Sequence, residues 1–184
     1  MEAIFYTIKT LISILVVIVP LFLIVAYVTY SERKIIGFMQ SRMGPMRVGP
    51  SGLLQPIADV LKLVSKEIII PSNANKGIFL TAPMLMLIPS LLVWSVIPLS
   101  EYFIISNINA GLLFILALTS LSVYGVILAG WASNSKYAFL GSMRSAAQII
   151  AYEIAMGFAL VGVLMLSGSL NLQNIIYAQS GSLF

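Results

Sequence analysis

Four apolar runs, each long enough to cross a bilayer as a helix, leave few folds open to this chain. They cover about residues 5–30, 77–99, 110–132 and 146–166. A bilayer core of ~30 Å is crossed by ~20 helical residues, so each run suffices for one span. Only 9% of the residues are charged, against roughly 25% in soluble domains. The pattern predicts an all-α, polytopic membrane protein with four transmembrane helices in a single membrane domain.

The first run is expected to be a retained span rather than a secretory signal. It is too long for the apolar core of a signal peptide, no small-residue cleavage site follows it, and it ends in the charged residues of 31–34. Pro20 removes one helical hydrogen bond and predicts a kink in this span. Pro83, Pro89 and Pro98 predict a bent second span that packs against its neighbours.

Positive charge is concentrated in two of the loops between these runs, which hold nine of the ten Lys and Arg residues. These nine are Arg33, Lys34, Arg42, Arg47, Lys62, Lys66, Lys76, Lys136 and Arg144. The loop between the second and third runs carries Glu101 as its charged residue. Because loops rich in Lys and Arg stay on the cytoplasmic side, both basic loops are expected in the cytoplasm or the mitochondrial matrix.

An amphipathic surface helix is predicted at about residues 53–70. Its apolar residues recur at steps of three and four, which gives the helix one apolar face. That face contains Leu54, Ile57, Ala58, Leu61, Val64 and Ile68, and the polar stripe contains Gln55, Asp59, Lys62 and Lys66. Such a helix is expected to lie along the membrane surface. Glu67 falls outside the stripe and is expected among apolar side chains, which disfavour the charged form of a carboxylate.

Two Gly-Pro turns, 44–45 and 49–50, precede this helix, and each lies close to an arginine. Arg42 and Arg47 could bind a phosphate or a carboxylate. They could equally be topology signals beside turns that serve the fold alone. Neither glycine pattern of nucleotide-binding loops is present, so this loop is not expected to bind a nucleotide.

One carboxylate, Glu153, falls inside the fourth run. Ionisable groups within a span are costly, and by default they indicate an ion path or a buried pair. Glu153 could instead pair with Arg144 or extend toward the membrane interface. The charged residues of 32–34 also allow two interpretations, an interfacial anchor or part of a site. Asp59 and its neighbouring lysines could be a solvated helix face.

The sequence contains no cysteine and no histidine, which excludes several kinds of chemistry. Without thiolate or imidazole ligands, this chain is not expected to bind haem, an iron–sulfur cluster or zinc. Catalytic constellations built on histidine or cysteine are impossible. Nucleic-acid binding is not expected, because the basic loop lies against a membrane.

Two long stretches resemble one known family. They read ERKIIGFMQSRMGPMRVGPSGLLQPIADVLKLVSKE at 32–67 and GWASNSKYAFLGSMRSAAQIIAYE at 130–153. They resemble, in the same order, the membrane subunit called subunit 1 or H of respiratory complex I, the proton-translocating NADH:quinone oxidoreductase. The resemblance covers essentially the whole chain. It implies a helical bundle at the junction of the membrane arm and the peripheral arm.

The resemblance also implies that the chain helps to form a quinone cavity and couples quinone reduction to proton translocation. The positions implied at or near the cavity are Glu32, Arg33, Arg42 and Asp59. Glu67 and Glu153 match the family's buried carboxylates on the proton path. Arg144 matches a basic residue that could pair with one of them.

No redox centre is implied in this chain. Quinone is the implied substrate, whereas NADH, FMN and the iron–sulfur clusters belong to partner subunits. The implied partners are the hydrophilic quinone-reducing subunits, small membrane-arm subunits and lipid, in the bacterial cytoplasmic membrane or the mitochondrial inner membrane. Family members are nearly twice this length. The chain is therefore expected to correspond to the N-terminal half and to need a C-terminal half to complete the site.

Two positions depart from the family pattern, which usually has Asn at Met46 and Pro at Ile68. A membrane anchor of a related energy-converting hydrogenase is an alternative, since such complexes share this subunit type without using quinone. A stand-alone transporter would use the proline-rich second run as a discontinuous helix. That alternative leaves the long basic loop unexplained.

Overall fold

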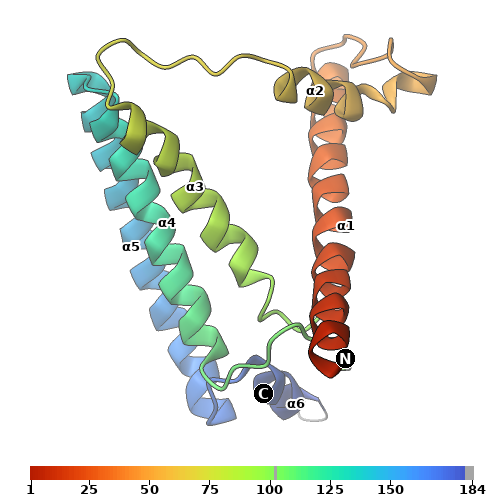
Figure 1. The fold of residues 1–184 in the computed structure, drawn as a ribbon, viewed down its shortest axis with the longest axis vertical. Helices are drawn as coiled ribbons and strands as arrows, with labels where there is room; N and C mark the ends of the chain where they lie inside the picture. Colours follow the sequence, from red (N-terminus) through yellow and green to blue (C-terminus); the bar gives the residue numbers. More distant parts are fainter. Residues whose placement is uncertain (102, 181–184) are drawn as a thin grey trace. The chain divides into compact units, whose positions relative to one another are not determined.

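The computed structural model describes residues 1–101 and 103–180, and within these residues all regular structure is helical. The elements are α1 (Glu2–Met39), a 3-10 turn (Pro50–Gly52), α2 (Gln55–Val64), α3 (Lys76–Val93), α4 (Gly111–Ala132), α5 (Lys136–Ser167) and α6 (Leu172–Gln179). Four of the helices, α1, α3, α4 and α5, are long and apolar enough to cross a membrane (Figure 1). The predicted all-α class with four transmembrane helices is therefore confirmed.

Residues Met1–Ile69 form one compact unit. Its helix α1 has 38 residues and continues through Pro20 as one helix. At a rise of ~1.5 Å per residue it is about 57 Å long, well beyond the ~30 Å of a bilayer core. The apolar run ends near residue 30, but the helix continues to Met39 and carries the charged residues of 32–34. Figure 1 shows α2 crossing this end of α1.

The loop after α1 folds back onto the last turns of that helix. The Arg42 amide donates to the Gly37 carbonyl at 2.9 Å. The Tyr30 hydroxyl donates to the Ser51 carbonyl at 2.8 Å and so reaches 21 residues along the chain. These two hydrogen bonds hold the loop against α1 at both ends of its basic stretch.

Gly52 lies where this loop passes close to its own earlier turn at Pro45. Its φ is +79°, a region that side chains rarely allow, and a Cβ there would stand 2.1 Å from the Pro45 carbonyl oxygen. The Pro45 turn and the turn at Gly52 are thus in direct backbone contact. The Gly-Pro turns therefore fix the shape of the basic loop, whatever it binds.

Helix α2 is shorter than the helix expected at 53–70, since it begins at Gln55 and ends at Val64. The residues that follow Lys66 are not helical. Residues 68–70 are β-branched, which lowers helix propensity, and the residue before Pro71 is disfavoured in a helix. Glu67 consequently lies beyond α2 and is exposed, not among the apolar side chains of that helix.

From Ile70 onward the chain forms a second compact unit, in which α3 packs on α4 and α4 on α5 (Figure 1). Gly125 of α4 lets α3 approach closely, because a Cβ there would stand 2.9 Å from the Ala82 carbonyl oxygen. Ala82 is fully buried, and Val123 and Ala146 belong to the same core. Small residues thus set the distances between these three helices.

Two helix ends in this unit differ from the ends of the apolar runs. Helix α3 ends at Val93 rather than near residue 99, and Pro98 explains part of this because it lacks an amide donor and disfavours helix at the preceding residue. Helix α5 begins at Lys136 rather than near residue 146. Hydropathy locates the part of a helix that fits a bilayer core and misses the less apolar residues 136–145, which form nearly three turns at ~3.6 residues per turn. Arg144 therefore lies on α5 and not in a loop.

Candidate functional site

A salt bridge between Arg33 near the end of α1 and Asp59 of α2 is the one such pair among residues 1–101 and 103–180. Arg33 donates a guanidinium N–H to Asp59 Oδ2, and Gln55 Nε2 donates to Asp59 Oδ1 at 3.1 Å. The hydrogen bond from Arg33, and after it the one from Gln55, holds the pKa of Asp59 below its usual value of 3.8. The carboxylate is therefore charged at neutral pH and ties α2 to α1.

A hollow of about 440 Å³ lies beside this ion pair. It is lined by Arg33, Met43, Gly44, Pro45, Met46, Arg47 and Gln55. Methionine side chains adapt to apolar ligands, and guanidinium groups donate hydrogen bonds in a fixed planar arrangement. The hollow therefore suits a ligand with an apolar body and an oxygen acceptor. We refer to it as the arginine hollow.

Lys34, the residue after Arg33, packs beside the arginine hollow. Its ammonium group lies 5.4 Å from the centre of the Tyr30 ring and 3.7 Å from Met46 Sδ. A cation over an aromatic face is attracted by the partial negative charge on that face of the ring. Lys34 therefore helps to fix Met46, which lines the arginine hollow, and Tyr30, which holds the loop.

Arg42 and Glu32, which were also expected at a quinone cavity, do not take part in the salt bridge between Arg33 and Asp59. Arg42 donates from Nε to Gln40 Oε1 at 2.8 Å, and it does not line the arginine hollow. Glu32 is exposed on α1, and its carboxylate makes no hydrogen bond or ion pair with the residues described. The structure thus brings Arg33 and Asp59 together, and the roles of Glu32 and Arg42 stay predictions.

The second candidate site is built around Glu153 of α5. Ser120 of α4 donates from Oγ to Glu153 Oε2 at 3.0 Å. The other carboxyl oxygen, Oε1, is buried and has no hydrogen-bond partner within the described parts of the chain. A buried oxygen without a donor is costly, so this atom marks a place where a proton or a water molecule would bind.

A cavity of about 430 Å³ adjoins this pair, between α4 and α5. It is lined by Leu116, Ser120, Val123, Tyr124, Ile127, Ile150, Glu153 and Ile154. Glu153 lies about 25 Å along α5 from Lys136 at the helical rise of ~1.5 Å per residue. The cavity therefore lies far from that end of the helix, and its polar groups are few among apolar side chains. We refer to it as the Glu153 cavity.

Arg144 does not pair with Glu153. The two residues are nine positions apart on α5, which corresponds to roughly 13 Å along the axis and to opposite faces of the helix. Arg144 is exposed, and so is Glu67. Neither forms an ion pair within the parts of the chain that are described. No contact in the described parts of the chain supports the roles expected for Arg144 and Glu67, and these roles stay predictions.

The sequence reasoning did not single out Ser120 or Tyr124. The available signal was the presence of polar side chains within the apolar run of α4. That signal is weak, because a serine in a helix usually bonds a carbonyl of its own preceding turn. Ser120 also does this, with the Leu116 carbonyl 3.0 Å away, so its second partner on α5 is visible only in the structure.

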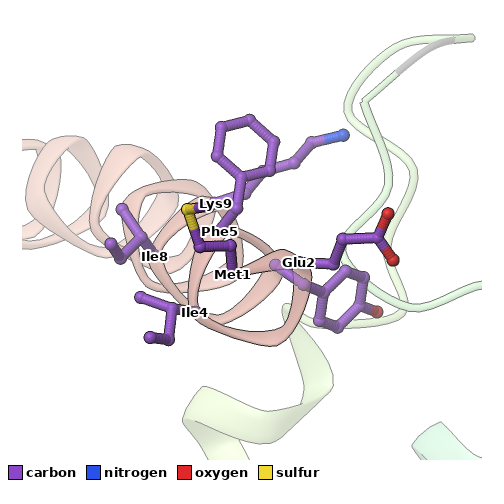
Figure 2. Close-up of a pocket in the computed structure, with 7 residues that line it drawn as sticks. Met1, Glu2, Ile4, Phe5, Ile8 and Lys9 are labelled. Carbon is purple, nitrogen blue, oxygen red and sulfur yellow. The ribbon is translucent and has the colours of Figure 1, made fainter.

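A third hollow, of about 980 Å³, lies along the first turns of α1 (Figure 2). Its lining consists of Met1, Glu2, Ile4, Phe5, Tyr6, Ile8 and Lys9. Six of the seven residues belong to α1 and Met1 directly precedes it, whereas binding sites are normally concave spaces with walls from several elements. We therefore assign no site there.

Comparison with known families adds a match over nearly the whole chain. The model of a family described as NADH dehydrogenase matches residues 12–184. The matched part contains the arginine hollow, the Glu153 cavity and both stretches that carried the resemblance in the sequence.

Proposed function

Since the chain belongs to the NADH dehydrogenase family, that of the complex I membrane subunit 1, we propose that it helps to form a quinone-binding cavity and couples quinone reduction to proton translocation. The observation that carries this proposal is the buried, unpartnered Oε1 of Glu153 on a helix able to span a membrane. An ionisable group in such a place by default belongs to an ion or proton path. The chain would act with other complex I subunits in the inner membrane.

The arginine hollow is the part of this chain that would contribute to quinone binding. A quinone has an apolar body and carbonyl oxygens, which fits a space lined by methionines and guanidinium groups. Asp59 would keep Arg33 oriented toward the head group, since a paired guanidinium loses less freedom when it binds. Glu32 and Arg42 would lie near the same cavity. The electrons would come from a partner subunit.

Proton translocation would use the carboxylates Glu67 and Glu153. Reduction of the quinone consumes protons and changes the local charge. That change would alter the proton affinity first of Glu67 and then of Glu153, because nearby charge favours one protonation state of a carboxyl over the other. Each group would then take up a proton on one side and release it on the other.

The experiment that tests the proposal replaces Glu67 or Glu153 with glutamine in the assembled complex. Quinone reductase turnover and proton translocation are measured together in sealed membranes. Glutamine keeps the size of the side chain but cannot exchange a proton. Parental translocation in both variants would remove these residues from the path.

Replacing Asp59 with asparagine is expected to lower quinone reductase turnover several-fold, because Arg33 loses the carboxylate that orients it. Arg33→Gln is expected to give a similar loss. The double variant is expected to be no worse than either single variant, since both remove the same interaction. The measurement is steady-state NADH:quinone reductase activity per assembled complex, with Lys66→Gln as a charge control from the same loop.

A double-variant loss equal to the product of the two single losses would contradict this coupling.

Lowering the pH offers a second check on the Arg33–Asp59 pair. Because the folded pKa of Asp59 is depressed, the ion pair contributes above the ordinary value of 3.8 and is lost as the pH falls through the lowered pKa. The pair is therefore expected to be insensitive to pH throughout the neutral range.

A further inference from the structure

Ser120 has two acceptors within reach and one proton to donate. Its Oγ lies 3.0 Å from Glu153 Oε2 on α5 and 3.0 Å from the Leu116 carbonyl oxygen on its own helix. A serine hydroxyl carries a single O–H donor. It can therefore donate to Glu153 or to Leu116, but not to both with full strength at once.

The protonation state of Glu153 decides which acceptor is better. A charged carboxylate accepts a stronger hydrogen bond than a neutral carbonyl does, so the hydroxyl donates to Oε2 while Glu153 is ionised. Once Glu153 is protonated, this advantage is lost and the Leu116 carbonyl competes on equal terms. The hydroxyl thus interacts differently with the two states of the carboxyl group.

The same contact distinguishes the two oxygens of Glu153. Oε2 is occupied by Ser120, whereas Oε1 is buried without a hydrogen-bond partner in the residues described. A proton arriving at the carboxylate therefore finds Oε1 free. The Glu153 cavity of about 430 Å³ has room for several waters at ~30 Å³ each, and Tyr124 is the other titratable residue of its lining.

We propose that Ser120 is a positioning residue for Glu153 in proton translocation. Its hydroxyl holds Oε2 so that Oε1 is the atom that takes up and releases the proton. The hydroxyl turns to the Leu116 carbonyl when Oε1 is protonated and returns when the proton leaves to water in the cavity. This inference rests on the proposed function of Glu153.

The test compares Ser120→Ala, Ser120→Thr and Ser122→Ala in assembled complex in sealed inside-out vesicles. Ser122 is the matched control, because its hydroxyl donates to the Thr119 carbonyl of its own helix at 2.6 Å. The readouts are proton translocation per NADH oxidised and the infrared carboxyl band of Glu153, which is identified by its disappearance in Glu153→Gln.

Ser120→Ala is expected to lower proton translocation about tenfold, the change that loss of one hydrogen bond to a charged group produces, and to shift the infrared band. Ser120→Thr keeps a hydroxyl and is expected to restore both readouts, and Ser122→Ala should match the parent. Parental translocation and an unshifted band in Ser120→Ala would overturn the inference, and so would a loss that threonine does not rescue. Parental translocation in Glu153→Gln would instead overturn the proposed function of Glu153, and this inference with it.

Discussion

Replacing Glu153 with glutamine is expected to lower proton translocation by the assembled complex about a hundredfold, the scale on which a positioned proton-transfer group contributes. The amide has nearly the same size as the carboxyl group, and its oxygen can still accept the hydrogen bond from Ser120. It cannot take up or release a proton. The packing of α4 on α5 should therefore persist while the chemistry at Oε1 is lost. The measurement is the pH change across sealed vesicles per NADH oxidised.

Glu101→Gln is the matched control for this experiment. Glu101 is exposed in the segment between α3 and α4, and the substitution removes the same charge at a position that adjoins no cavity described above. It should leave proton translocation at the parental value. Equal translocation in the two variants would show that the carboxyl group of Glu153 is not used.

The class of fold could be predicted because four long apolar runs allow few alternatives. The helix ends could not be predicted as well, since hydropathy records only the part of a helix that fits a bilayer core. Lys136 starts α5 and Met39 ends α1, and both lie in polar stretches outside the apolar runs. The helical periodicity through 53–70 likewise gave no sign that α2 stops at Val64.

The candidate site was predictable only where its residues stand out one at a time. Arg33, Asp59 and Glu153 are charged residues in or beside apolar sequence, so each could be singled out. Which groups they meet depends on the structure: the packing of α4 on α5 brings Ser120 to Glu153. The extension of α5 back to Lys136 puts Arg144 and Glu153 on one helix, nine residues apart and on opposite faces. Glu67 was expected among apolar side chains on a helix over 53–70. The helix α2 ends before this residue, so Glu67 lies beyond it and is exposed.

Replacing Gly52 with alanine is expected to lower quinone reductase activity, measured per amount of membrane protein, about tenfold. The thermal unfolding temperature of the complex is also expected to fall. A left-handed φ of +79° at this position costs a residue with a Cβ roughly 1–2 kcal/mol. The new Cβ would also stand 2.1 Å from the Pro45 carbonyl oxygen and 2.6 Å from its carbon, both backbone atoms. No side chain can turn aside to relieve this overlap, so one of the two turns must move.

The substitution of Gly52 is expected to affect the arginine hollow as well, because Pro45 forms part of its wall. Pro45 and Met46 line the arginine hollow together with Arg33, so a displaced turn changes the shape of the proposed quinone contact. Gly77→Ala is the control: the nearest heavy atom to its Cβ would be Asn75 Oδ1 at 3.7 Å, and alanine is favoured over glycine in a helix by ~1 kcal/mol. This control should retain parental activity and stability. Parental activity together with an unchanged unfolding temperature in Gly52→Ala would show that the two turns do not pack in the assembled complex as they do here.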